Sequence, residues 1–203
     1  MKQCFRNNGL SIVLLGLFLL FWAGQAMTGF KDYTEDCQMH GTHPPSFTDY
    51  LSSDHFWEAT FENWESEFLQ MAAYVVLTVF LYQKGSAESN DPDKDHTQQS
   101  NRKHPWVYRH SLSLALVALF LLSWGGHAIA GWKTHNGELR EHGRPEISIV
   151  AFLGAARFWF ESFQNWQSEF LAVASIVILS IWLREAGSPE SKDLDAPHHK
   201  TGK

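Results

Sequence analysis

A short polar segment occurs twice in this chain, and the repetition constrains the fold more than any other feature. Residues 63–69, NWESEFL, return as residues 165–171, NWQSEFL, 102 positions later. When residues 10–89 are aligned with residues 112–191, 33 of the 80 positions are identical and no gap is needed. We therefore predict two copies of one structural unit, joined by a linker.

Each copy contains two apolar segments. Residues 10–30 form a run of 21 residues without a charge, and residues 112–132 match it. At about 1.5 Å of rise per residue, this length spans a hydrocarbon core of about 30 Å. The second apolar segment begins at Trp64 in one copy and at Trp166 in the other. We predict four transmembrane helices, at residues 10–30, 64–83, 112–132 and 166–183.

A cleaved signal peptide is the alternative explanation for residues 10–30. Lys2 and Arg6 precede the apolar run, and small residues lie near Ala26, as in secretory signals. The matching segment at residues 112–132 lies in the middle of the chain, where a signal peptide has no use. The repeat therefore favours a retained transmembrane helix at residues 10–30.

The segments between the apolar runs set the domain organisation. Residues 84–108 and 185–203 are polar and contain too little apolar surface to order themselves by burial. We expect a cytoplasmic N-terminus at residues 1–9, the first two-helix repeat at 10–83, a flexible linker at 84–108, the second repeat at 109–184 and a disordered tail at 185–203.

Lys and Arg predict the orientation in the membrane. With the N-terminus inside, eleven of these residues lie on the cytoplasmic side and five on the other side. Both termini are then cytoplasmic, and the two repeats are parallel, related by an axis along the membrane normal. The predicted fold is an all-α integral membrane helical bundle, a tandem two-helix repeat in parallel orientation.

Two features of the outer segments predict additional local structure. Ser46, with Asp49 three residues later, is typical of the start of a short helix. Residues 147–160, ISIVAFLGAARFWF, are far more apolar than residues 47–58, FTDYLSSDHFWE. This segment is too short to cross a membrane. It is interfacial, re-entrant or a helix buried against the bundle.

Nine Trp residues are many for a chain of 203 residues. Trp collects at membrane interfaces, where the ring faces hydrocarbon and its N–H reaches the headgroup layer. Six of them lie near predicted helix ends and are expected to act as interface anchors: Trp22, Trp57, Trp64, Trp124, Trp159 and Trp166.

The polar residues near the outer helix ends are the candidate functional cluster. Glu67 and Glu169 lie at the edges of predicted transmembrane helices, where ionisable residues are costly and often functional. Asn63 and Asn165 share a helix face with them, four residues earlier. The carboxylates could form a proton or cation relay, join the helices, or lie in the headgroup layer, favoured by the helix dipole.

Gln25 and His127 occupy equivalent positions inside the first helix of each copy and complete the candidate cluster. A hydrogen bond from His127 to Glu169 would satisfy both side chains. Haem ligation by His127 is the weaker alternative, because no second axial ligand lies at a similar depth. The two cysteines, Cys4 and Cys37, form no metal-binding pattern. We expect neither a metal nor a cofactor.

Several function classes are disfavoured. A net charge of −6 and the lack of a basic stripe argue against nucleic-acid binding. The sequence contains no P-loop, dinucleotide fingerprint, nucleophile elbow or zincin helix, so we expect no enzymatic activity.

Two repeated elements carry a resemblance to a known family. WxGxAxxG spans residues 22–29, and NWxSEF begins at Asn63 and again at Asn165. With these elements, residues 5–191 resemble a family of small bacterial integral membrane proteins known only as a domain of unknown function. The resemblance implies bacterial origin and membrane residence. It supplies no catalytic residue, substrate or partner.

The sequence thus predicts a structural or interaction protein of the bacterial cytoplasmic membrane. Its expected partners are the lipid bilayer and further copies of the chain in a homo-oligomer. The alternative is a small oligomeric transporter or channel that uses the Asn and Glu pairs at the outer ends of the second helix of each repeat.

Overall fold

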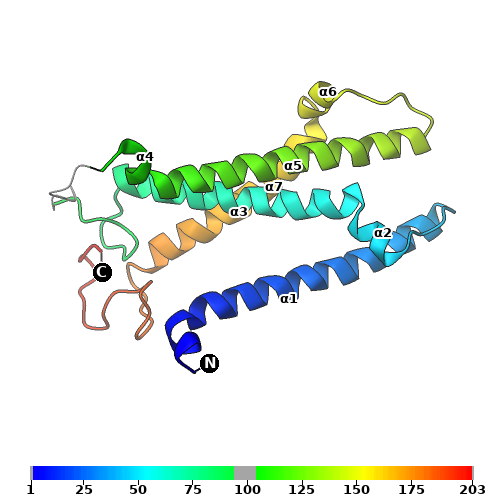
Figure 1. Cartoon of the computed structure of the whole chain (residues 1–203). Coiled ribbons are helices and arrows are strands. Elements are labelled where there is room, and N and C mark those ends of the chain that lie inside the picture. Colours follow the sequence, from blue (N-terminus) through cyan, green and yellow to red (C-terminus); the bar gives the residue numbers. More distant parts are fainter. Residues whose placement is uncertain (1, 94–103, 203) are drawn as a thin grey trace. The chain divides into compact units, whose positions relative to one another are not determined.

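The computed structural model describes residues 2–93 and 104–202, which form helices joined by turns (Figure 1). The chain divides into two compact units, Met1–Trp57 and Glu58–Lys203, and the boundary lies inside α3 (Asp54–Phe80). Each unit is described by itself. Within the predicted linker, residues 94–103 lie outside the described residues.

The first unit contains α1 (Lys2–Met39), α2 (Phe47–Leu51) and the start of α3. The helix α1 continues nine residues beyond the predicted span and ends where Gly41 adopts a φ of 69°. There the N–H of Thr42 donates to the carbonyl of Cys37 at 2.8 Å, which closes the last turn. Ser46 caps α2, as predicted, by accepting the N–H of Asp49 at 3.2 Å.

An aromatic cluster holds the first unit together. Tyr50 and Phe56 are buried, and the Trp22 ring lies 6.1 Å from the Phe56 ring, centre to centre. A Cβ on Gly29 would lie 2.3 Å from the hydroxyl oxygen of Tyr50. Glycine at the end of the WxGxAxxG element thus lets α2 approach α1.

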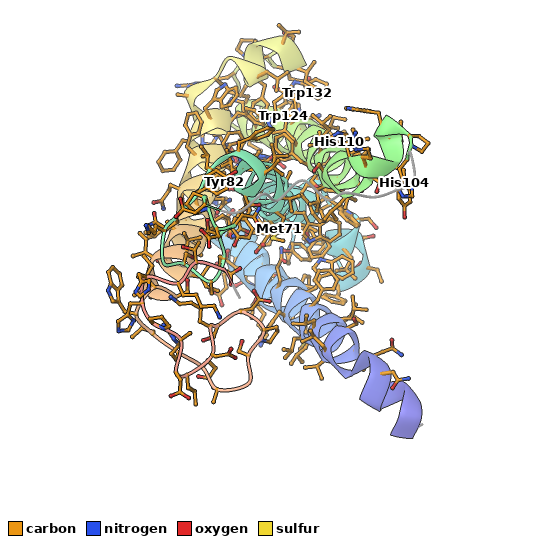
Figure 2. The ribbon with its side chains drawn as sticks, turned by 90° about the vertical axis from the view of Figure 1, so that its left-hand side faces the viewer. Met71, Tyr82, His104, His110, Trp124 and Trp132 are labelled. Atoms are coloured by element: carbon orange, nitrogen blue, oxygen red, sulfur yellow. The ribbon has the colours of Figure 1, made fainter. Side chains whose placement is uncertain are left out.

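The second unit contains the rest of α3 together with α4 (Trp106–Arg109), α5 (Ser111–Glu141), α6 (Ile149–Leu153) and α7 (Ala156–Leu179). Phe152 and Phe158 are fully buried and pack beside Trp124 and Trp132 of α5, which are labelled in Figure 2. The indole N–H of Trp132 donates to the Ile147 carbonyl at 2.7 Å. The apolar segment 147–160 therefore comprises α6 and the start of α7, and it packs on α5 through Phe152 and Phe158, while Val150 and Phe160 are exposed.

The two copies of the sequence repeat fold alike in their local details. Adding 102 to the bounds of α2 gives the bounds of α6, and the last residues of α1 and α5 are related by the same shift. Ser148 caps α6 as Ser46 caps α2. The buried residues of the first aromatic cluster, Ala26, Tyr50 and Phe56, correspond to Ala128, Phe152 and Phe158 in the second.

Two helices are long and apolar enough to cross a membrane: α1 from Asn7 to Met39, and α5. Large apolar side chains are exposed along both helices. The other two predicted spans are helical as far as Phe80 in α3 and Leu179 in α7. Both helices begin before the predicted spans, and α3 carries several acids in its first half. The all-helical prediction is confirmed, and the crossing of α3 and α7 remains a prediction.

The C-terminal segment makes buried hydrogen bonds. Lys192 is 2% exposed, and its ammonium lies within hydrogen-bond distance of the backbone oxygens of Gly85, Ile181, His198 and Lys200. Hydrogen bonds to charged groups are among the stronger ones. The disorder of the tail, expected because the segment has little apolar surface, stays a prediction.

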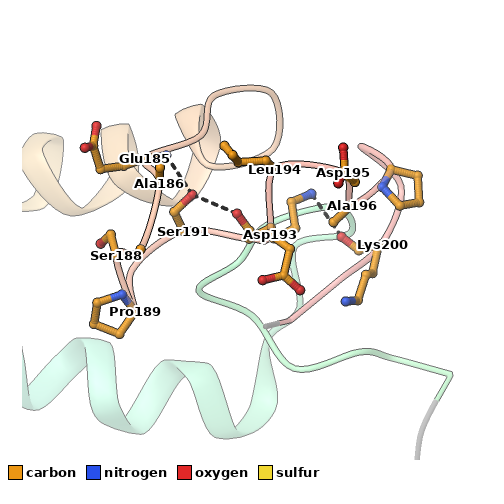
Figure 3. Close-up of a pocket in the computed structure, with 13 residues that line it drawn as sticks. Glu185, Ala186, Ser188, Pro189, Ser191, Asp193, Leu194, Asp195, Ala196 and Lys200 are labelled. Atoms are coloured by element: carbon orange, nitrogen blue, oxygen red, sulfur yellow. Dashed lines mark hydrogen bonds between the residues drawn. The ribbon is translucent and has the colours of Figure 1, made fainter.

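The same segment packs on the turn that follows α3. The N–H of Gly202 donates to the carbonyl of Ser86 at 2.9 Å, and the hydroxyls of Ser86 and Ser180 are 3.0 Å apart. Figure 3 shows the turns of residues 185–200. They line a hollow of about 890 Å³. Residues of the tail alone line this hollow, so it is separate from the ionisable cluster described next.

Candidate functional site

Three acids of α3 project from one face of the helix. Glu58, Glu62 and Glu65 are spaced four and three residues apart, which places them along a single stripe. Glu65 is fully buried, Glu58 is 8% exposed and Glu62 is partly buried. Burial of three carboxyl groups is costly unless they are paired or protonated, so their partners decide what the site can do.

His127 of α5 lies at the centre of this cluster and is fully buried. Its Nδ1 lies 3.1 Å from Oε2 of Glu65, and its Nε2 lies 3.5 Å from Oε2 of Glu161 on α7. The Phe158 ring packs 5.0 Å from the imidazole, centre to centre. One fully buried imidazole therefore lies between carboxylates from two different helices.

Small residues of α5 allow this helix to pack closely against α3. A Cβ on Gly126 would lie 2.6 Å from the Phe61 ring of α3. A Cβ on Gly131 would lie 2.9 Å from Oε1 of Glu58 and 3.2 Å from the Phe152 ring. The glycines on either side of His127 thus bring α5 against the acidic face of α3.

The α7 helix supplies the remaining partners. Asn165 donates from Nδ2 to Oε1 of Glu62 at 2.7 Å, and the Trp166 indole N–H donates to Oε1 of Glu65 at 3.1 Å. Arg157 donates from Nε to Oε1 of Glu161 at 2.9 Å. Its Nη1 also binds Glu138 of α5. The cluster therefore combines four carboxyl groups with one imidazole and one guanidinium.

The environment separates the proton affinities of the carboxyl groups. The pKa of Glu58 is raised to about 7, chiefly by burial and partly by the neighbouring Glu161 carboxylate, against the hydrogen bond from Thr134 and the charges of Arg157 and His127. Burial also raises the pKa of Glu62. In Glu161, burial opposes ionisation, but the His127 imidazole at 3.5 Å and the hydrogen bond from Arg157 outweigh it and lower the pKa. The pKa values of the neighbouring Glu58 and Glu161 are thus shifted in opposite directions.

Arg157 remains charged in this environment. Burial disfavours its guanidinium, but hydrogen bonds to Glu138 and Glu161 more than compensate and raise its pKa. Its side chain is 34% exposed, compared with 20% for Glu161 and 0% for His127. Polar groups therefore lead from the surface inwards to the histidine, and the cation lies at the outer end.

The structure brings together some of the residues predicted from the sequence. His127 and Asn165 are in the cluster, but His127 binds Glu65 and Glu161 in place of the expected Glu169. Asn63 and Glu67 are exposed, and Asn63 donates to the Ala59 carbonyl of its own helix at 2.7 Å. Glu169 is half-buried and its backbone oxygen accepts the Gln70 amide at 3.4 Å. Gln25 belongs to the first unit.

The predicted Trp anchors make specific contacts inside the units. Trp22 and Trp57 belong to the aromatic cluster of the first unit, with ring centres 6.3 Å apart. Trp124 packs on Phe158. Trp159 donates to the Leu153 carbonyl at 2.9 Å, Trp166 binds Glu65, and Trp64 packs against Phe61. Anchoring at a membrane interface stays a prediction for all six.

Sequence reasoning missed five members of the cluster: Glu58, Glu62, Glu65, Arg157 and Glu161. The spacing of the three α3 acids was a usable signal, since it defines one helix face. Two of the three acids precede the predicted transmembrane span, so a search for ionisable residues within the spans does not find them. The positions 102 residues after them hold Phe160, Gln164 and Gln167, so the acids have no counterpart in the second copy.

The haem alternative for His127 requires a free ring nitrogen. Both nitrogens lie against carboxylates, so an iron would have to displace Glu65 or Glu161. The described residues contain no group of three or more His, Cys, Asp or Glu placed to hold a metal ion. The site as it stands can bind and transfer protons.

Fold and site together define a helical protein with two helices of membrane-spanning length and an acid–histidine centre buried among its helices. The chain belongs to the family described as Domain of unknown function (DUF6766), whose model matches residues 1–203. No curated protein matches the chain, and no solved structure does.

Proposed function

We propose that the chain is a multi-pass protein of the bacterial cytoplasmic membrane, with four crossings, two parallel repeats and both termini in the cytoplasm. The lengths and exposed apolar surfaces of α1 and α5 support membrane insertion. The excess of Lys and Arg in the termini and the linker supports the orientation. Cys37 is buried, so a cysteine introduced at the exposed His40 in a Cys37→Ser background is labelled with an impermeant maleimide on intact spheroplasts, because this topology places residue 40 outside.

Duplication of a two-helix unit is supported by details beyond the helix bounds. The turns after α3 and α7 share their hydrogen bonds: the N–H of Gln83 donates to the Ser89 hydroxyl at 2.8 Å, and the N–H of Glu185 donates to the Ser191 hydroxyl at 3.0 Å. Gly85 and Gly187 both adopt positive φ, at 86° and 80°. Independent segments rarely share this much local geometry at a constant offset.

We further propose that the protein conducts protons, and that the buried cluster is the group through which they pass. One observation carries this proposal: His127 is fully buried between carboxylates of two other helices. An ionisable residue inside a membrane bundle is costly and marks ion or proton pathways. Histidine can both accept and donate a proton near neutral pH, and carboxyl groups flank both of its nitrogens.

A structural role is the second candidate, in line with the role expected from the sequence. The bonds from Asn165 to Glu62 and from Trp166 to Glu65 tie α3 to α7 and support it. Under this alternative, His127→Gln changes the stability of the protein, and neither the wild type nor the variant conducts protons. Neither candidate involves a chemical conversion.

Native mass spectrometry of mildly solubilised protein tests the predicted homo-oligomer.

Proton flux into liposomes tests the proposed function. Purified protein is reconstituted with a pH-sensitive dye inside the vesicles, and a potassium gradient with valinomycin sets the membrane potential. Wild-type protein is expected to acidify the lumen faster than empty vesicles do. His127→Gln should abolish the difference, because an amide of similar size cannot carry a proton.

His142→Gln is the matched control, since His142 lies at the end of the same helix and is exposed. Its flux should equal that of the wild type. Thermal unfolding of each variant in detergent shows whether it is folded. Equal flux in wild-type and empty vesicles, or an undiminished flux in folded His127→Gln protein, would contradict the proposal.

A further inference from the structure

Four buried polar atoms on the three helices of the cluster have no hydrogen-bond partner among the described residues: Glu58 Oε1, His127 Nε2, Glu161 Oε2 and Ser162 Oγ. They come from α3, α5 and α7, and Ser162 directly follows Glu161 in α7. The residues Glu58, His127 and Ser162 are 8%, 0% and 0% exposed. Buried polar groups are almost always satisfied, so these four atoms require an explanation.

The distance between His127 and Glu161 points to the same place. Nε2 and Oε2 are 3.5 Å apart, at the outer limit for a direct hydrogen bond. A polar contact of this length is often bridged by water. An internal water typically makes about three hydrogen bonds to otherwise unsatisfied buried groups. An imidazole, a hydroxyl and two carboxyl groups provide both donors and acceptors for it.

We infer that these four atoms surround an internal water molecule, and that Glu58 is the carboxyl group that takes up and releases a proton through it. The inference rests on the proton-conducting function proposed above. In the transfer, His127 starts as the neutral imidazole, with its proton on Nδ1 beside Glu65 and with Nε2 free to accept. The Glu58 O–H bond breaks as the water gains that proton. The water gives one of its own protons to Nε2 of His127, so the water is restored and the charge moves inwards.

The contacts distinguish Glu58 from Glu161 as the exchanging group. Arg157 binds Oε1 of Glu161 directly, and His127 lies on the other oxygen, so Glu161 is held as an anion. Glu58 faces Thr134 and His127 of α5, Glu161 and Arg157 of α7, and Glu62 of its own helix. It has no direct ion pair, and its burial favours the neutral acid.

The position of Glu58 also suits entry of protons. It lies one turn after the start of α3 at Asp54, and it is slightly exposed, whereas Glu65 and His127 are fully buried. Arg157 lies on the other polar approach, and its positive charge repels protons there. Gly131 leaves the space into which Oε1 of Glu58 fits.

Infrared spectroscopy of the purified protein tests this inference without a flux measurement. The carbonyl stretching band of a protonated carboxylic acid is followed while the pH is raised from acid to alkaline. The wild type should lose a band with a midpoint near neutral pH. Glu58→Gln should lack this titration, whereas Glu67→Gln, which changes an exposed acid of the same helix, should keep it.

Ser162→Ala probes the water. Removal of one hydrogen-bonding group should shift the frequency of the titrating band and its midpoint. Thr134→Val removes a hydroxyl that stabilises ionised Glu58, so the midpoint of the Glu58 titration should move to higher pH. This variant replaces Glu58→Gln as the test if Glu58→Gln fails to fold. A wild-type titration that survives in folded Glu58→Gln, or that is unmoved by Thr134→Val, overturns the role of Glu58. An unchanged band in Ser162→Ala overturns the bridging water.

The flux assay separates this inference from the proposed function. Glu58→Gln should reduce flux about tenfold or more, in the range of losses of acid–base groups. If it conducts like the wild type while His127→Gln does not, the inference fails and the function stands. If wild-type vesicles show no flux but the Glu58 band titrates as described, the function fails while the proton-binding assignment holds.

Discussion

The Nδ1 atom of His127 lies 3.1 Å from Oε2 of Glu65, and both side chains are fully buried. The pair joins α5 to α3 where no solvent can replace either partner. Removal of one member therefore leaves the other buried without its main contact.

His127→Ala should lower the free energy of unfolding by about 3 kcal/mol or more, because it leaves the buried Glu65 carboxyl group without its main partner. His127→Gln keeps a hydrogen-bonding group and should cost less. Chemical unfolding in mild detergent, followed by circular dichroism, measures both. His142→Ala, at an exposed site, should leave the stability within experimental error, and an equal loss there would show that the effect is not specific to the cluster.

Glu58 should make the protein less stable as the pH rises. Its pKa in the folded protein is raised to about 7 from the ordinary 4.5, so the folded state holds a proton that the unfolded chain releases. The contribution is complete below the unfolded pKa and is lost as the pH rises through 7. Thermal unfolding at pH values on both sides of 7 should show a falling midpoint in the wild type and a flatter profile in Glu58→Gln.

Arg157 should govern stability in acid. The pKa of Glu161 is lowered in the fold, so its contribution is present above the ordinary value of 4.5 and disappears as the pH falls through the folded value. Arg157→Met removes one of the two groups that hold Glu161 ionised. The midpoint of acid unfolding should then move to higher pH. An unchanged midpoint would show that His127 alone holds this carboxylate.

Two adjacent glycines of α5 should respond in opposite ways to the same substitution. A Cβ on Gly126 would lie 2.6 Å from the Phe61 ring, so Gly126→Ala forces α3 and α5 apart and should destabilise the protein. A Cβ on Gly125 meets nothing within 4 Å. Gly125→Ala should be neutral or stabilise the helix by up to about 1 kcal/mol. Thermal unfolding of the two variants side by side makes the comparison.

Lys192 should hold the C-terminal segment in place. Lys192→Met removes a cation that binds four backbone oxygens, and limited proteolysis should then cleave residues 185–202 faster than in the wild type. Lys200 is the matched control, since only its backbone oxygen contacts Lys192. Lys200→Met should leave the cleavage rate unchanged; similar rates for both variants would mean that the ammonium does not secure the segment.

Sequence patterns predicted the helices well because their causes are local. The apolar runs gave α1 and α5, and Ser46 with Asp49 indicated the short α2. The mirrored features at Ser148 follow from the constant offset of 102 residues. Turn chemistry and helix capping depend on neighbours in the chain, so one sequence is sufficient to find them.

The candidate site was harder to predict, because tertiary packing determines which face of each helix is buried. The α3 helix has two polar stripes, one through Asn63 and Glu67 and one through Glu58, Glu62 and Glu65. Both satisfy helical spacing, and only the approach of α5 and α7 decides which is buried. His127 was identifiable as an ionisable residue in an apolar run. Its partners were not, since Glu65 and Glu161 lie 62 and 34 positions away.

The α7 helix lacks the three acids of α3, and this difference determines how many titratable centres each chain contributes. Where α3 carries Glu58, Glu62 and Glu65, the equivalent positions of α7 carry Phe160, Gln164 and Gln167, and Gln25 stands where α5 has His127. The described part of one chain therefore provides one such centre, although the sequence is duplicated. Proton uptake should count one such centre per chain, and an assembly of several chains should offer as many parallel routes as it has subunits.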